Sequence, residues 1–216
     1  MTRRRVAVLI SGRGSNLAAL IAACRHPDYP AGICLVVSNR AEAGGLQLAE
    51  LAGIPNTVVD HGAYPTKPDF EAALDAALEQ AGADLVCLAG FMRLLSPAFV
   101  ESWRDRLLNI HPSLLPAFPG LRTHERALEA GVTIHGATVH FVRAETDQGP
   151  IVAQGAVPVL PGDTVETLAA RVLKIEHRLY PLALRLVASG AASVVGERVR
   201  LMGETDADAT LLSPPG

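Results

Sequence analysis

Two side chains that could do chemistry together stand two positions apart near the middle of the chain. Asn109 and His111 flank Ile110 at the end of a short apolar run. On a β-strand, residues i and i+2 point to the same face, so the carboxamide and the imidazole would project together while Ile110 turns into the core. Such a pair can donate to a developing oxyanion and handle a proton. A structural hydrogen-bonded turn is the alternative interpretation.

A glycine-rich segment, residues 11–16 (Ser-Gly-Arg-Gly-Ser-Asn), lies between the first predicted strand and the first predicted helix. Glycines let the backbone approach an anion, and a helix N-terminus offers free N–H groups and a positive dipole. We expect Ser15 or Asn16 to cap the helix. Leu17 replaces the glycine of a dinucleotide fingerprint, and the Walker pattern is absent, so the segment predicts one bound phosphate rather than NAD or ATP. An ordinary strand-to-helix turn is the alternative.

Longer motifs around these residues resemble the folate-dependent formyltransferases. Residues 107–116, Leu-Leu-Asn-Ile-His-Pro-Ser-Leu-Leu-Pro, are similar to the active-site signature of that superfamily. The glycine-rich segment narrows the resemblance to the glycinamide ribonucleotide formyltransferase family. Further matching segments extend the resemblance over about residues 6–190: 88–93, 135–136, 147–150 and 176–177.

The resemblance implies roles for individual positions. Asn109, His111 and Asp147 match the catalytic trio of the family. The binding positions that it implies are Gly14, Ser15, Asn16 and Glu176 for the substrate phosphate and ribonucleotide, and Lys67, Met92, Arg93, Leu94, Leu95 and Arg143 for the folate. Lys67 departs from the arginine of the family, and Arg122 from a histidine of some members, so we assign Arg122 no role. His135 is a further candidate, with a buried core histidine as the alternative.

The implied reaction is transfer of the formyl group of 10-formyltetrahydrofolate to the amine of 5-phosphoribosylglycinamide in de novo purine biosynthesis. The amine attacks directly, Asn109 and His111 stabilise the oxyanion, and Asp147 favours the cationic form of His111 and assists proton transfer. The folate is a co-substrate. No histidine pair has a spacing such as HExxH, so we expect no metal, and we interpret His140 and His177 as structural.

Three other functions remain open. A hydrolase of the same formyl folate usually carries an N-terminal regulatory domain, whereas this chain begins directly with the first predicted strand. A non-catalytic nucleotide-binding module would have no reason to keep both Asn109 and His111. The relative that formylates methionyl-tRNA usually has a further C-terminal domain, and about 26 residues follow Gly190 here.

The elements that must position these residues alternate between strands and helices. Apolar runs predict strands over residues 6–10, 33–37, 57–59, 85–89, 107–110, 133–142 and 151–159. Helical apolar spacing predicts helices over residues 16–24, 44–52, 70–81, 97–103, 123–130 and 164–188, the last with a kink or break at Pro181. This alternation predicts an α/β fold with a Rossmann-like, mostly parallel twisted sheet flanked by helices.

We expect a single formyltransferase domain over residues 1–190 with two lobes. The N-terminal lobe, about 1–100, would bind the nucleotide, and the lobe over about 101–190 would hold the folate and the catalytic residues. Residues 191–216 would form a tail with a short hairpin, and Arg3–Arg5 a solvated end.

Composition sets limits on partners and location. Hydrophobic residues make up 49% of the 216 residues and charged residues 19%, a composition that argues against intrinsic disorder. The net charge of −3 argues against a basic surface that binds nucleic acid. No apolar stretch approaches a membrane span. Cys24, Cys34 and Cys87 lack CxxC spacing, which indicates free thiols in a reducing cytoplasm. We therefore expect small-molecule substrates, no nucleic acid, no membrane and a monomer or weak homodimer.

Overall fold

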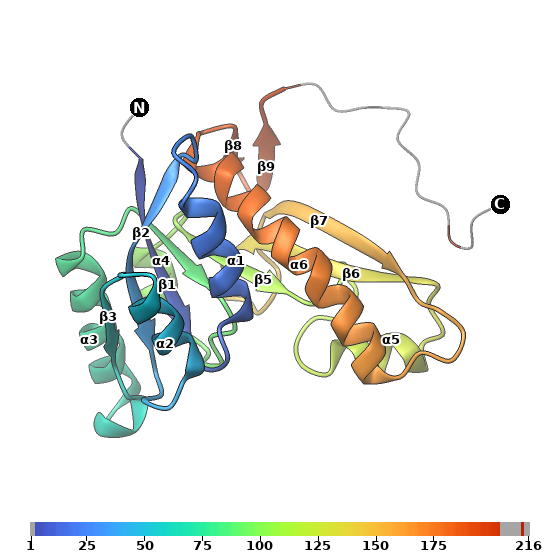
Figure 1. Ribbon diagram of the computed structural model, residues 1–216, viewed down its shortest axis with the longest axis horizontal. Coiled ribbons are helices and arrows are strands. Elements are labelled where there is room, and N and C mark those ends of the chain that lie inside the picture. Colours follow the sequence, from blue (N-terminus) through green and yellow to red (C-terminus); the bar gives the residue numbers. More distant parts are fainter. Residues whose placement is uncertain (1–2, 204–212, 214–216) are drawn as a thin grey trace.

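A single twisted sheet organises the computed structural model, which describes residues 3–203 and residue 213 (Figure 1). Its strand order is β3-β2-β1-β4-β5-β6-β7. The strands are β1 Arg4–Ile10, β2 Ala31–Ser38, β3 Asn56–Val58, β4 Leu85–Leu88, β5 Leu107–His111, β6 Ile134–Phe141 and β7 Ile151–Pro158. The first five pair in parallel, while β5–β6 and β6–β7 pair antiparallel. The prediction of a mostly parallel α/β sheet is therefore confirmed.

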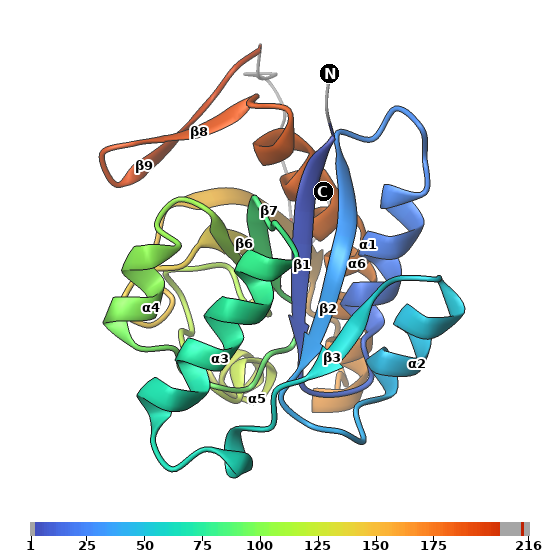
Figure 2. The same ribbon diagram turned by 90° about the vertical axis from the view of Figure 1, so that its left-hand side faces the viewer.

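Helices cover both faces of this sheet. Their bounds are α1 Ser15–Cys24, α2 Gly44–Leu51, α3 Lys67–Gln80, α4 Pro97–Ser102, α5 Thr123–Glu129 and α6 Val165–Ala188, with a 3-10 turn, η1, at His61–Ala63. Figure 2 shows α3 and α4 on one side of the central strands and α1, α2 and α6 on the other. All the predicted helices are present within a few residues of the expected bounds.

The central strands are buried from both sides, which explains their unbroken apolar runs. Val6, Val8 and Ile10 of β1 belong to the core beneath α1, α2 and α6, whereas Ala7 and Leu9 belong to the core beneath α3 and α4. All five are fully buried. The alternation of the two cores along one strand follows from the two-residue period of its side chains.

The long helix α6 is fixed to the middle of the sheet and is not broken by its proline. The buried Tyr180 hydroxyl lies 3.2 Å from the carbonyl oxygens of both Leu88 and Leu108. Leu88 is the last residue of β4, and Leu108 lies within β5. The helix continues from Val165 to Ala188 through Pro181, so of the predicted kink or break the break is wrong. Proline removes one backbone hydrogen bond, and the tertiary packing of the following turn on the sheet outweighs that loss.

The arginines at the start of the chain are not simply solvated, contrary to our expectation. The Arg3 guanidinium donates to the carbonyl oxygens of Tyr29 and Ala31 at 3.0 and 3.1 Å. Arg5 donates in the same way to Ala81 and Gly82. These bonds satisfy the carbonyl groups of two turns beside β1.

The expected hairpin near the C-terminus is present. Strands β8 (Ala192–Val195) and β9 (Arg198–Leu201) form a separate two-stranded antiparallel sheet. Figure 2 shows it at the end of the molecule above α4. The rest of the predicted tail, residues 204–212 and 214–216, lies outside the described residues. The division into two lobes stays a prediction. Within the described part of the chain, no helix is both long enough and apolar enough to cross a membrane.

Candidate active site

Four polar side chains meet beside β5. The Asp147 carboxylate lies between two imidazoles, with Oδ2 3.4 Å from Nδ1 of His111 and Oδ1 3.7 Å from Nε2 of His140. Nδ2 of Asn109 is 3.3 Å from the same Nε2 of His140. Ile110, between the two predicted residues, is buried in the core. The structure thus brings the predicted trio into one cluster and adds His140 to it.

The loop between β6 and β7, residues 142–150, carries Asp147 into this cluster. The loop closes where the N–H of Phe141 donates to the Pro150 carbonyl at 2.9 Å. Gly149 is required there, because a Cβ atom would collide with the Phe141 carbonyl oxygen. Asp147 adopts a φ of 59°, and its Oδ2 accepts a 2.8 Å hydrogen bond from the N–H of Gly120. The carboxylate is therefore held in place by the backbone N–H of Gly120 and its own backbone geometry as well as by His111.

Both ring nitrogens of His111 face acceptor oxygens. Its Nδ1 faces the Asp147 carboxylate, and its Nε2 lies 3.1 Å from the carbonyl oxygen of Phe118. A neutral imidazole has only one N–H, so two acceptors match the doubly protonated ring. The His111 side chain is 8% exposed, so its contact with Asp147 lies largely away from water.

His140 orients Asn109. Its Nδ1 is 2.9 Å from the Phe141 carbonyl oxygen, so Nδ1 carries the proton and Nε2 is an acceptor. Burial lowers the pKa of His140, more than the neighbouring Asp147 raises it, and this favours the neutral ring. One Nδ2 hydrogen of Asn109 is then committed to His140, and its second remains for another acceptor. Sequence reasoning missed this role because the antiparallel pairing of Asn109 with His140 has no local signal.

His135 lies behind the cluster. It is 1% exposed, and its Nε2 is 3.2 Å from Nδ1 of His124. Burial, with a smaller contribution from His124, lowers the pKa of His135 to about 4. The ring of Phe118, whose carbonyl faces His111, packs edge-on against it. The observed partners of His135 are those of a neutral histidine that supports the loop after β5, which contains Phe118.

The glycine-rich segment meets α1 without a side-chain cap. Gly14, with a φ of 79°, is the N-cap residue, and the helix starts at Ser15, so the predicted capping by Ser15 or Asn16 is wrong. A Cβ atom on Gly14 would lie only 2.7 Å from the Cα of Gly45, so packing against α2 also demands glycine there. The uncapped N–H groups of the first helical turn are suited to an anion.

A buried amide–carboxyl pair joins α1 to α6. Nδ2 of Asn16 donates to Oε2 of Glu176 at 2.7 Å, and both residues are 8% exposed. Burial raises the pKa of Glu176, and the Asn16 hydrogen bond offsets part of that rise. Oδ1 of Asn16 is buried without a hydrogen-bond partner. An acceptor in that position fits a ligand hydroxyl or amine.

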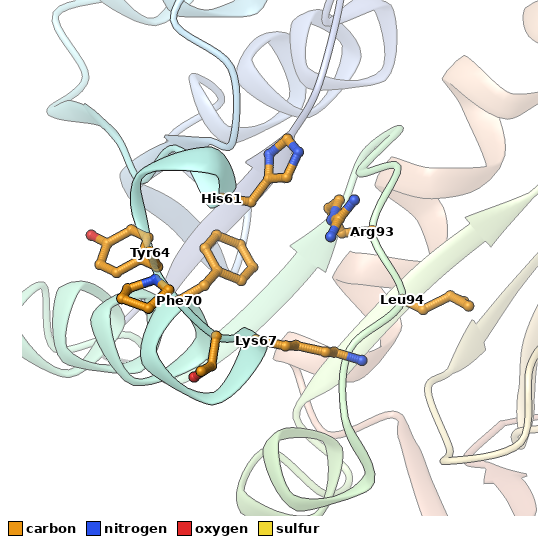
Figure 3. Close-up of a pocket in the computed structure, with 8 residues that line it drawn as sticks. His61, Tyr64, Lys67, Phe70, Arg93 and Leu94 are labelled. Carbon is orange, nitrogen blue, oxygen red and sulfur yellow. The ribbon is translucent and has the colours of Figure 1, made fainter.

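The predicted folate segment follows β4. Figure 3 shows Arg93 and Leu94 of this segment beside Lys67 at the start of α3, around a cavity of about 110 Å³. Met92 and Leu94 are 65% and 73% exposed, whereas Leu95 packs on the core beneath α3. Exposed apolar side chains beside two cations suit a ligand that is part aromatic and part carboxylate.

The folate segment is tied to the phosphate segment. The N–H of Met92 donates to Oγ of Ser11 at 2.8 Å, and the Ser11 hydroxyl donates to Oδ1 of Asn39 at 2.6 Å. The two predicted binding segments therefore share one edge of the sheet, the carboxyl ends of β1 and β4, where open α/β sheets bind ligands.

Arg143 has partners that its implied role in folate binding does not explain. Each nitrogen of its guanidinium donates to the protein: Nε to Glu197 at 2.8 Å, one Nη to Asp105 at 2.7 Å and the other to the Val142 carbonyl at 3.1 Å. The side chain is 7% exposed. Its contact with folate stays a prediction.

The described residues contain no group of three or more His, Cys, Asp or Glu side chains arranged to hold a metal ion. The two buried thiols of Cys24 and Cys87 are poor ligands as well, because burial raises their pKa to about 11 and about 12.

Comparison with known proteins assigns the chain to a family. The model of the formyl transferase family matches residues 4–184, and the chain therefore belongs to that family. It is 46% identical to phosphoribosylglycinamide formyltransferase of Escherichia coli, over 86% of this chain and 87% of the other. The crystal structure of glycinamide ribonucleotide transformylase 1 from Symbiobacterium toebii superposes with a TM-score of 0.90 at 51% identity, covering 93% and 95% of the two chains.

Longer relatives contain this region as one part. The chain is 53% identical to the trifunctional purine biosynthetic protein adenosine-3 of Bos taurus, over 94% of this chain but 20% of the bovine protein. The chain thus spans about a fifth of the length of that relative.

Proposed function

We propose that this protein transfers the formyl group of 10-formyltetrahydrofolate to the amine of 5-phosphoribosylglycinamide in de novo purine biosynthesis. The observation that carries the proposal is the buried cluster of Asn109, His111 and Asp147, which combines an amide donor, an imidazole and a carboxylate. The identity to proteins named for this reaction adds support.

The chemistry needs no nucleophile from the protein. The substrate amine attacks the formyl carbon, which leaves an oxyanion and an ammonium on the tetrahedral intermediate. The second Nδ2 hydrogen of Asn109 would donate to this oxyanion, and the charge of His111 would stabilise it further. Collapse breaks the bond from the formyl carbon to the folate nitrogen. Asp147, acting through water, would help to move one proton from the ammonium to that leaving nitrogen.

The two substrates would occupy the two segments at the carboxyl edge of the sheet. The uncapped first turn of α1, with Gly14, Ser15 and Asn16, suits the phosphate. Asn16 Oδ1 and Glu176 are placed to accept from the ribonucleotide. The exposed apolar residues 92 and 94 and the cations Lys67 and Arg93 suit the folate ring and its carboxylates.

The test is to follow the absorbance of tetrahydrofolate as it forms while each acceptor is offered separately, with EDTA present. We expect turnover that depends on the glycinamide ribonucleotide and continues in EDTA. The Asn109→Ala protein is the matched control, because it should bind both substrates while turnover falls.

Three outcomes would reject this assignment. Full-rate turnover with water alone would favour the formyltetrahydrofolate hydrolase. A rate that rises only with methionyl-tRNA would reject the assignment to purine biosynthesis. No turnover with any acceptor, despite nucleotide binding, would favour the non-catalytic module.

We infer further that the protein works in the cytoplasm as a monomer or weak homodimer, on small molecules alone. The three free cysteines support a reducing compartment. Analytical ultracentrifugation over a range of concentrations tests the oligomeric state, and a stable tetramer would contradict it.

A further inference from the structure

An ion cluster joins the C-terminal hairpin to the loop that carries Asp147. The carboxylate of Glu197, in the turn between β8 and β9, accepts from Nε of Arg143 at 2.8 Å and from Arg104 at 2.5 Å. Asp105, which precedes β5, accepts from the other end of the Arg143 guanidinium at 2.7 Å. Three segments far apart in the sequence therefore meet at one buried arginine.

Arg143 has a special position in the chain. It is the second residue of the 142–150 loop and lies four residues before Asp147. The loop is held at its far end by the contacts of Asp147 with His111 and the N–H of Gly120. At its near end the N–H of Val142 donates to the Leu107 carbonyl at 2.8 Å, and the Arg143 side chain adds two carboxylates to this anchor.

The two carboxylates hold Arg143 in one orientation. Its planar guanidinium presents a fixed set of N–H groups, so partners on two edges define its plane as well as its position. The side chain is only 7% exposed, while Asp105 and Glu197 are 44% and 58% exposed. Removing both carboxylates would leave a buried positive charge without counter-ions, and the loop would have to move to hydrate it.

We propose that Arg143 is a positioning residue, and that Asp105 and the hairpin residue Glu197 clamp it so that the 142–150 loop presents Asp147 to His111. This gives a role to the hairpin, which lies beyond the residues 4–184 matched by the family model. The effect on turnover rests on the proposed formyl transfer, whereas the effect on the loop does not.

The test compares Glu197→Gln, Asp105→Asn and the double variant with the unmodified protein. Both substitutions keep size and remove charge, and Asn tolerates the left-handed φ of 57° at position 105. Glu101→Gln is the matched control, since Glu101 pairs with Arg104 at 3.1 Å within the same cluster. Arg143→Lys keeps the positive charge, but a single ammonium group replaces the planar guanidinium that bonds both carboxylates.

Two readouts separate positioning from simple stabilisation. We expect kcat of the double variant to fall about five- to tenfold, with the KM for the ribonucleotide changed less than twofold. Hydrogen exchange of the amides of residues 143–149 should accelerate by a similar factor, well below the Tm. Arg143→Lys should lie between the double variant and the unmodified protein, and Glu101→Gln should match the unmodified protein.

Several results would overturn the clamp. Unchanged exchange of the loop in the double variant would do so, whether or not the protein transfers formyl groups. The clamp would also be refuted if the loss of kcat were fully explained by the fraction of unfolded protein, or if Glu101→Gln lost as much kcat as the double variant. If the unmodified protein showed no transferase activity, while the double variant still showed faster hydrogen exchange in the loop, the proposed function would be rejected and the role of Arg143 in positioning the loop would be supported.

Discussion

Lowering the pH from 7 to 4.5 should destabilise this protein through His135 in particular. His135 is 1% exposed, and burial lowers its pKa from 6.5 to about 4. The unfolded chain therefore binds a proton at this residue between pH 6.5 and 4, while the folded chain does not. Stability rises with pH wherever the unfolded state binds more protons, so this contribution is complete above pH 6.5 and is lost as the pH falls toward 4.

The size of the effect follows from the gap between the two pKa values. A gap of about 2.5 pKa units corresponds to roughly 3 kcal/mol, because each unit is worth about 1.4 kcal/mol. At pH 4.5 most of this should already be lost, about 2–3 kcal/mol. Burial also lowers the pKa of His124 and His140, so the total loss in the unmodified protein should be larger.

The assay is urea denaturation at pH 7 and pH 4.5, with His135→Gln as the variant that does not titrate. The difference in unfolding free energy between the two pH values should shrink by about 2–3 kcal/mol in His135→Gln. His26→Gln is the control, because the His26 side chain is 67% exposed, and it should leave the difference unchanged. Equal pH dependence in the unmodified protein and His135→Gln would refute the reasoning.

Three further predictions concern the candidate site. Asn109→Ala should lower kcat by roughly 10²–10³ with a normal Tm, the cost of one oxyanion donor, and a loss of tenfold or less would contradict its role. Asp147→Asn should lower kcat and remove the carboxylate partner of His111 Nδ1, so the ¹⁵N shifts of the His111 ring should change; unchanged shifts would show that the two side chains are not coupled. Gly14→Val should lower the Tm as well as raise the KM for the ribonucleotide, because its Cβ would crowd Gly45. A raised KM with an unchanged Tm would show that α2 yields easily, and a raised KM for both substrates alike would mean that the segment is only a turn.

Much of the fold is predictable from the sequence because its strands and helices carry strong periodic patterns. The bounds of α3 show the limit: the apolar stripe predicts a start at residue 70, whereas the helix begins at Lys67. The Thr66 side chain caps it by accepting from the N–H of Asp69 at 3.3 Å, and Pro68 lies in the first turn. The capping residue determines where a helix starts, and the spacing of apolar residues carries no information about the cap.

Strand periodicity predicts the candidate site only where its residues are close in sequence, and Asp147 is predicted through the family resemblance instead. Asn109 and His111 share a strand, so the two-residue period brings them together. Arg143 meets Asp105 and Glu197 across 38 and 54 residues, and no local pattern encodes such contacts. His140 enters the cluster because β6 runs antiparallel to β5, a reversal that follows four parallel pairings in the same sheet.

The strand order has a consequence for how the cluster assembles. From β4 onward each strand pairs with the strand that follows it in the chain, whereas β1 and β4 are neighbours in the sheet but are separated by β2 and β3 in the chain. Asn109, His111, His140 and Asp147 therefore all come from one stretch of 39 residues, 109–147, whereas β1 must pair with β4 across some 79 residues. Contacts of short sequence separation cost less chain entropy to form. The chemical groups of the site thus belong to a low-contact-order unit, and the substrate-binding edge to the slower, long-range part of the sheet.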